Sequence, residues 1–216
     1  MDNHLSPNFL ETASDELQRL ALEEALKRHL IEREVRVMVF PAGKSDLPFE
    51  LAQHGITVTA LDDPEWKSAC LKRISKGKFG ERVSFVPGNL GSLDQEFTDE
   101  PFDLIVCRRG LCSLPYAEAM SAIRALLRKL RIGGKLYISV LGIHSELGDG
   151  YAGIDVPVRD RYFTLSPTIA KKYGIDNPVC LYGERDIFLL LLEAGASVLR
   201  TFTSTHGSVK AVAGRV

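Results

Sequence analysis

The sequence lacks an excess of one charge, a long apolar run and a paired cysteine motif. Its 27 Lys and Arg residues nearly balance 28 Asp and Glu residues, which gives a formal net charge of −1. Without a basic excess, binding to nucleic acid through general phosphate neutralisation is disfavoured, although a local basic patch remains open. The four cysteines have no CxxC spacing, so we expect no metal site and no thioredoxin-like redox motif.

No part of the sequence is expected to enter a membrane. The longest strongly apolar run covers residues 187–192, far fewer than the ~20 residues that cross a bilayer. The first residues, MDNHLSPNF, lack the positive start and the apolar stretch of a signal peptide. We therefore expect a cytoplasmic protein whose cysteines are reduced thiols.

The composition is that of an ordinary globular protein. Hydrophobic residues make up 45% and charged residues 25% of the chain, which excludes disordered, collagen-like and disulfide-scaffold proteins. The length of 216 residues predicts one domain with additions. We expect a helical extension at residues 1–34 and an α/β domain at residues 35–216.

Short β-prone runs alternate with helical segments between residues 35 and 141. The expected strands cover residues 35–40, 56–61, 83–86, 102–107 and 135–141, and the expected helices cover 46–54, 65–76 and 116–130. Such alternation is typical of parallel strands joined by right-handed crossovers. The strands are continuous apolar runs, as burial on both faces requires. The pattern predicts an α/β, doubly wound sheet with helices on both faces.

Residues 142–182 interrupt this alternation, because glycines and prolines are frequent and apolar runs are few. We interpret this segment as an insertion or lid. A helix is expected to follow from residue 185, and then two strands near 198–203 and 209–213. The short turn between those strands predicts a hairpin.

Ligands of open α/β sheets bind beyond the carboxyl ends of the strands, where the strand order reverses. The first loop at that edge contains a GKS triplet, so a phosphate-binding P-loop is one interpretation. A P-loop needs a glycine where Met38 stands, and Pro41 lacks the N–H that would contact phosphate. A plain strand-to-helix turn, in which Ser45 or Asp46 caps the next helix, explains the local sequence adequately.

The next two loops carry polar side chains with two possible roles. Asp62 and Asp63 end the second strand, where an acid can accept hydrogen bonds from ribose hydroxyls or cap the following helix. Asn89 follows the third strand, where its amide can pair with an adenine edge or belong to an ordinary turn. The residues alone leave both alternatives open.

Taken together, residues 35–141 resemble the class I S-adenosylmethionine-dependent methyltransferases. The resemblance runs in order through VRVMVFPAGKSDLPFELAQHGITVTALD, VSFVPGNL, PFDLIVCRRGLCSLP and ALLRKLRIGGKLYISV. Residues 185–216 also resemble the closing helix and hairpin of that family. The resemblance implies a mostly parallel seven-stranded sheet in the order 3-2-1-4-5-7-6, with the last strand antiparallel.

The resemblance also implies S-adenosylmethionine as cofactor and S-adenosylhomocysteine as product. The glycine-rich first loop of the family, acidic-x-G-x-G-x-G, is matched by Val39, Pro41, Gly43 and Ser45, so only the middle glycine remains. In the family's scheme Asp62 binds the ribose, and Asn89 and Leu90 lie at the adenine. The residues implied to bind the cofactor are Pro41, Ala42, Gly43, Ser45, Asp62, Asp63, Asn89, Leu90 and Arg108.

Methyl transfer from a sulfonium mainly requires an acceptor held in line with the methyl group. A general base is needed where the acceptor must lose a proton. His144, just after the fifth strand, is the best-placed candidate, although an ordinary loop histidine fits it as well. Tyr162 in the insertion is the weaker candidate.

The near-neutral charge favours a small-molecule acceptor over nucleic acid. The altered first loop leaves a second function open, a catalytically inactive module of this fold that binds a ligand or a protein. The N-terminal helix is expected either to cover the cofactor site or to form a homodimer contact.

Overall fold

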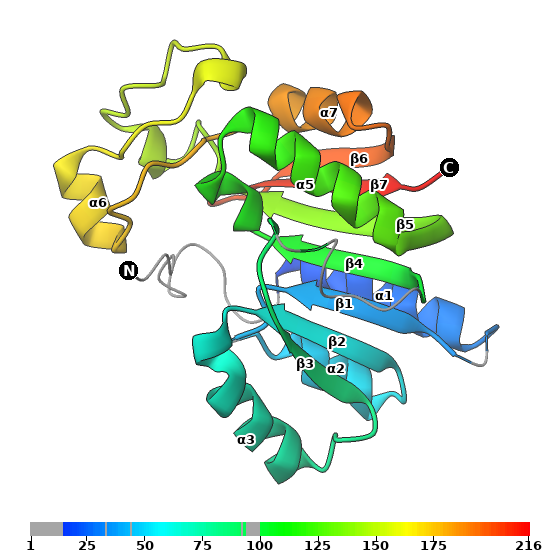
Figure 1. The fold of residues 1–216 in the computed structure, drawn as a ribbon. Coiled ribbons are helices and arrows are strands. Elements are labelled where there is room, and N and C mark those ends of the chain that lie inside the picture. The colour runs from blue at the N-terminus through cyan, green and yellow to red at the C-terminus, as the bar shows by residue number, and fades with distance from the viewer. Residues whose placement is uncertain (1–14, 33, 44, 92, 94–99) are drawn as a thin grey trace.

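The protein was analysed as a computed structural model that describes residues 15–32, 34–43, 45–91, 93 and 100–216 (Figure 1). These residues form a seven-stranded sheet in the order β3-β2-β1-β4-β5-β7-β6. The strands are β1 (Arg36–Phe40), β2 (Thr57–Asp62), β3 (Val83–Pro87), β4 (Phe102–Arg108), β5 (Leu130–Val140), β6 (Ser197–Thr203) and β7 (Val209–Gly214). Strands β3, β2, β1, β4 and β5 pair in parallel, and β7 is antiparallel to both of its neighbours. The predicted order and the antiparallel last strand are confirmed.

Helices cover both faces of the sheet, as Figure 1 shows. The helices are α1 (Glu16–His29), α2 (Leu47–Gln53), α3 (Lys67–Gly77), α5 (Tyr116–Lys129), α6 (Pro167–Tyr173) and α7 (Glu184–Glu193), with short 3-10 turns at η1 (Pro64–Trp66), η2 (Gly110–Ser113), η3 (Glu146–Gly148) and η4 (Val158–Asp160). Val37 and Val39 of β1 pack in the core beneath α1, α2 and α3, whereas Met38 packs in the core beneath α5 and α7. Successive residues of a strand point to opposite faces, so one apolar run serves both cores.

In the helical extension expected at residues 1–34, the structure describes α1 from Glu16, and residues 1–14 lie outside the described residues. One predicted boundary differs from the structure. The fifth strand was expected from Lys135, but β5 begins at Leu130, which pairs with Phe102 across an irregular register. Gly133 and Gly134 therefore lie inside this strand, where Gly133 adopts a left-handed φ of 75°.

The insertion at residues 142–182 is held to the body of the fold by a buried arginine. Arg161 is 8% exposed. Its guanidinium donates to the carbonyls of Gly153, Val156 and Leu181 and to the carboxylate of Asp186 in α7, at 2.8–3.2 Å. A planar guanidinium can satisfy several acceptors at once, so Arg161 links three points of the insertion to one another and to α7.

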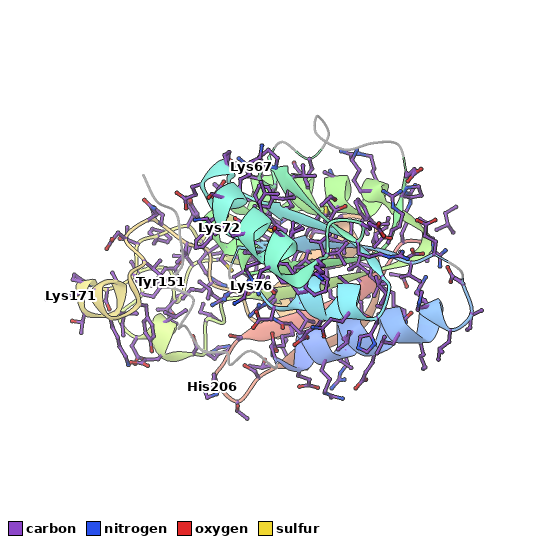
Figure 2. The ribbon with its side chains drawn as sticks, turned by 90° about the horizontal axis from the view of Figure 1, so that it is seen from below. Lys67, Lys72, Lys76, Tyr151, Lys171 and His206 are labelled. Atoms are coloured by element: carbon purple, nitrogen blue, oxygen red, sulfur yellow. The ribbon has the colours of Figure 1, made fainter. Side chains whose placement is uncertain are left out.

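The described part of the chain contains no helix with the length and apolarity that a bilayer crossing requires. It does contain a local row of basic side chains, which the overall charge had left open. Lys67, Lys72 and Lys76 are exposed along α3 (Figure 2). The near-neutral net charge therefore conceals an uneven surface.

A buried ion pair fixes α1 to the last strand. Lys210 of β7 donates to Asp15, which also caps α1 by accepting the N–H of Leu17. Both side chains are buried. Because removing one partner leaves an uncompensated charge in the core, Lys210→Met should lower the free energy of unfolding by roughly 3 kcal/mol or more.

Urea denaturation followed by circular dichroism measures this loss. The matched control is Arg19→Met, which removes the exposed pair with Glu23 in the same helix and should cost under ~1 kcal/mol. Equal losses for the two variants would contradict the structural role of Lys210.

Arg161 generates a second prediction. Arg161→Met removes the donor shared by three carbonyls and one carboxylate, and each unpaired buried group costs about 1–3 kcal/mol. We expect a lower unfolding free energy and faster proteolysis within residues 142–182. Arg159→Met is the control, because its pair with Glu193 is exposed, and it should leave the cleavage rate nearly unchanged.

Candidate functional site

The candidate site lies at the carboxyl ends of the parallel strands, on either side of the reversal in strand order between β1 and β4. Phe40, the last residue of β1, pairs with Cys107 near the end of β4. Asp62 ends β2 and pairs with Pro87 at the end of β3. The loops after all four strands therefore meet at one edge of the sheet, as the sequence predicts.

The carboxylate of Asp62 joins the first two loops. Asp62 is 3% exposed. Its Oδ2 accepts the N–H of Gly43 at 2.5 Å, and its Oδ1 accepts the N–H of Asp63 at 2.8 Å. Ionised carboxylates offer about four lone-pair positions, so these two bonds do not by themselves exhaust its capacity to accept. A charged acceptor held in this way suits the hydroxyls of a sugar.

Gly43 lies directly beneath the indole of Trp66. A Cβ added at Gly43 would be 2.7 Å from Cδ2 and 3.0 Å from Cε3 of Trp66, and 2.9 Å from Oδ2 of Asp62. Real side chains do not approach so closely, so the packing of Trp66 requires a glycine here. The family resemblance implied that Gly43 binds the cofactor, and it gave no role to Trp66. The only local signal was a lone tryptophan four residues after Asp62.

The other residues of the first loop fill structural roles. The N–H of Ala42 donates to the carbonyl of Leu61 at 3.0 Å, which attaches this loop to β2. The hydroxyl of Ser45 accepts the N–H of Leu47 at the start of α2, at 3.3 Å. Pro41 follows a cis peptide bond. The N-cap position of α2 is Asp46, whose side chain makes no capping hydrogen bond, so of the two expected caps only Ser45 bonds to an amide of this helix.

The third loop lies beside the end of β2. The N–H of Gly88 donates to the carbonyl of Asp62 at 2.9 Å. Asn89 is exposed, and its Oδ1 accepts the N–H of Gly91 at 2.8 Å, whereas Leu90 is buried. The structure therefore brings Asn89 and Leu90 to the same edge as Asp62.

The fourth loop adds two arginines at the end of β4. Arg108 and Arg109 are both half-buried. Arg109 has a left-handed φ of 58°, and its N–H donates to the carbonyl of Ser139 at 2.7 Å. A left-handed non-glycine residue is uncommon and is often found at functional loops.

The two candidate bases lie on the insertion side of this edge. His144 is exposed just after β5. Tyr162 is half-buried, and its hydroxyl donates to the carbonyl of Ser113 at 2.8 Å. Burial raises the pKa of Tyr162, which favours the protonated phenol at neutral pH. In this state Tyr162 anchors the insertion to the loop after β4.

The four cysteines are buried thiols rather than nucleophiles or ligands. None forms a disulfide, and all are described. Burial raises the pKa of Cys107 to about 12 and that of Cys180 to about 11, so both stay protonated near neutral pH. Cys112 accepts the N–H of Leu141 through Sγ at 3.0 Å. Among the described residues, no group of three or more His, Cys, Asp or Glu side chains is placed to hold a metal ion.

Comparison with known proteins bears on this edge of the sheet. A family model described as a methyltransferase domain matches residues 38–138, which include the loops after β1, β2, β3 and β4. No curated protein sequence matches the chain.

Several solved structures share the fold. An O-methyltransferase family protein from Burkholderia thailandensis is 17% identical with a TM-score of 0.64, and the match covers 92% of this chain and 56% of that protein. A SAM-dependent methyltransferase from Methanosarcina mazei is 19% identical with a TM-score of 0.67, covering 88% and 97%. PigF, solved with SAH, is 14% identical with a TM-score of 0.62, covering 90% and 54%. The chain thus spans about half the length of two of these proteins and nearly all of the third.

At these identities the structural matches establish the shared fold, and the family model adds a sequence match across the strands and loops that build the site. The sheet order is the one that the resemblance implied. Residues 38–138 are thus similar in sequence to a methyltransferase domain, and the chain shares its fold with solved S-adenosylmethionine-dependent methyltransferases.

Proposed function

We propose that the protein transfers a methyl group from S-adenosylmethionine to a small-molecule acceptor. The observation that carries the proposal is the Asp62 carboxylate, which is oriented by two backbone amides at the end of β2. It lies beside the loop that carries Asn89. Bound S-adenosylmethionine supplies a methyl group that its sulfonium has already activated.

The residues of the chain then have to bind and orient this cofactor. Asp62 accepts hydrogen bonds from the ribose hydroxyls, and Asn89 and Leu90 lie at the adenine. Arg108 lies where β4 ends, on the side of the site expected to face the acceptor. Pro41, Ala42, Gly43, Ser45 and Asp63 complete the proposed set as residues of the first two loops around the cofactor. PigF, which shares this fold, was solved with SAH, and that complex supports the same choice of cofactor here.

The acceptor is proposed to enter between the loop after β4 and the insertion. His144 is exposed near this side, and it is the proposed base where the acceptor must lose a proton. The Tyr162 hydroxyl is the second candidate, and it would have to leave the carbonyl of Ser113 to act. A net charge of −1 supports a small molecule over a nucleic acid.

The same features suggest where the protein works. The described chain holds four unpaired, buried thiols, which fit a reducing compartment such as the cytoplasm. A homodimer through the N-terminal region is proposed on the sequence alone.

Calorimetric titration with S-adenosylhomocysteine tests the cofactor site. Asp62→Asn retains the size of the side chain but replaces one acceptor oxygen by a donor and removes the charge. Because hydrogen bonds to a charged group contribute about 1.5–3 kcal/mol, we expect binding to weaken by tenfold or more.

Glu81→Gln is the control, since it makes the same chemical change at an exposed position before β3, and it should bind as the unaltered protein does. Binding that Asp62→Asn leaves unchanged would remove Asp62 from the site. If the unaltered protein binds neither S-adenosylmethionine nor S-adenosylhomocysteine, methyl transfer is excluded and an inactive ligand- or protein-binding module becomes the better account.

A further inference from the structure

We propose that Trp66 is a movable cover of the nucleoside site, whose indole closes over the Asp62 carboxylate in the ligand-free chain and moves away when a ribose binds. This inference rests on the proposed function, because it concerns access to the same site. It adds a residue that neither the glycine-rich loop nor the family's ribose-binding acid would indicate.

The indole of Trp66 and the carboxylate of Asp62 both lie against Gly43. Two ring atoms of Trp66 and Oδ2 of Asp62 all lie within 3.0 Å of the point where a Cβ on Gly43 would stand. The ring and the carboxylate therefore share the space on one side of Gly43. With Asp62 only 3% exposed, a sugar hydroxyl cannot reach its oxygens until a neighbouring group moves.

The backbone around Asp62 is the less mobile part of this arrangement. Amide hydrogen bonds from Gly43 and Asp63 hold the carboxylate. The Ala42 and Gly88 amides hold the adjoining loops to the carbonyls of β2. Moving any of these would break hydrogen bonds at a buried edge, where each unpaired group costs about 1–3 kcal/mol.

Trp66 is attached differently. It is the last residue of the three-residue turn η1, its own amide bonds within that turn, and its side chain is half-buried. Rotation about its side-chain bonds moves the indole without breaking any of the backbone hydrogen bonds that hold Asp62. Rotation of the ring is therefore a way to uncover the carboxylate that leaves these backbone hydrogen bonds in place.

A cover of this kind lowers the apparent affinity of the site. When the open state is only a fraction of the population, the apparent dissociation constant rises by the inverse of that fraction. Removing the ring should therefore strengthen binding, by up to about tenfold if the open state is about a tenth populated. If the ring instead stacks on the adenine, its removal should weaken binding.

The chain contains a single tryptophan, so its fluorescence reports Trp66 alone. During titration with S-adenosylhomocysteine we expect the emission maximum to shift to longer wavelength and acrylamide quenching to increase, as the indole enters water. An emission maximum that stays fixed or moves to shorter wavelength, with saturable binding, overturns the proposal.

A pair of glycine variants tests the contact without ligand. Gly43→Ala puts a methyl group against the indole, whereas a Cβ at Gly80 has no atom within 4 Å. Gly43→Ala should shift the emission to longer wavelength and Gly80→Ala should not, with circular dichroism confirming that both variants are folded. Identical spectra for the two variants would show that Trp66 does not lie on Gly43.

Calorimetry on Trp66→Ala separates the outcomes. Phe188→Ala is the control, an exposed aromatic on α7. Tighter binding of S-adenosylhomocysteine by Trp66→Ala alone supports the cover. Equal or weaker binding overturns the cover while the proposed function stands, and absence of binding to both the unaltered protein and Trp66→Ala overturns the proposed function and the cover together.

Discussion

Burial of the parallel strands on both faces is the constraint on which the rest of the structure depends. The central residues of β1 face one apolar core or the other, with Val39 fully buried under α1 and α2 and Met38 under α5 and α7. A polar side chain in mid-strand would have to be buried without water, at a cost of several kcal/mol unless it found a partner. Polar side chains that bind a ligand are therefore expected at the ends of the strands. This is why Asp62 and Asn89 end or follow strands, and why the site lies at an edge.

The same constraint explains how the first loop remains ordered with one glycine. Asp62 is buried at the end of β2, and a buried carboxylate needs hydrogen-bond donors. The amides of Gly43 and Asp63 are these donors. The carboxylate at the end of β2 therefore also holds the loop after β1. Ser45 accepts the first amide of α2, and Ala42 bonds to β2. In this chain the loop is thus held mainly by hydrogen bonds to β2 and α2.

The sequence predicted the strands and helices that depend on local residues or on the spacing of apolar residues. The apolar runs located the strands, and the resemblance supplied the order of β5, β6 and β7. Contacts between residues far apart in the chain were not accessible in this way. The Arg161 network joins the insertion to α7, and the pair of Lys210 with Asp15 joins β7 to the start of α1. Trp66 lies against Gly43, 23 residues earlier in the chain. In each case the partner depends on the fold, which no spacing in the sequence records.

The position of Trp66 also bears on how a first loop with only one of the family's glycines affects activity. Methyl transfer from a sulfonium depends on holding two groups in line rather than on a particular catalytic side chain. A first loop can therefore change its sequence as long as the acid after β2 keeps its orientation and can be reached. In this chain the backbone amides fix the orientation of Asp62, and the indole over Gly43 controls whether it can be reached. In the proposed arrangement, orientation and access are divided between separate residues, the amides of Gly43 and Asp63 for the first and Trp66 for the second.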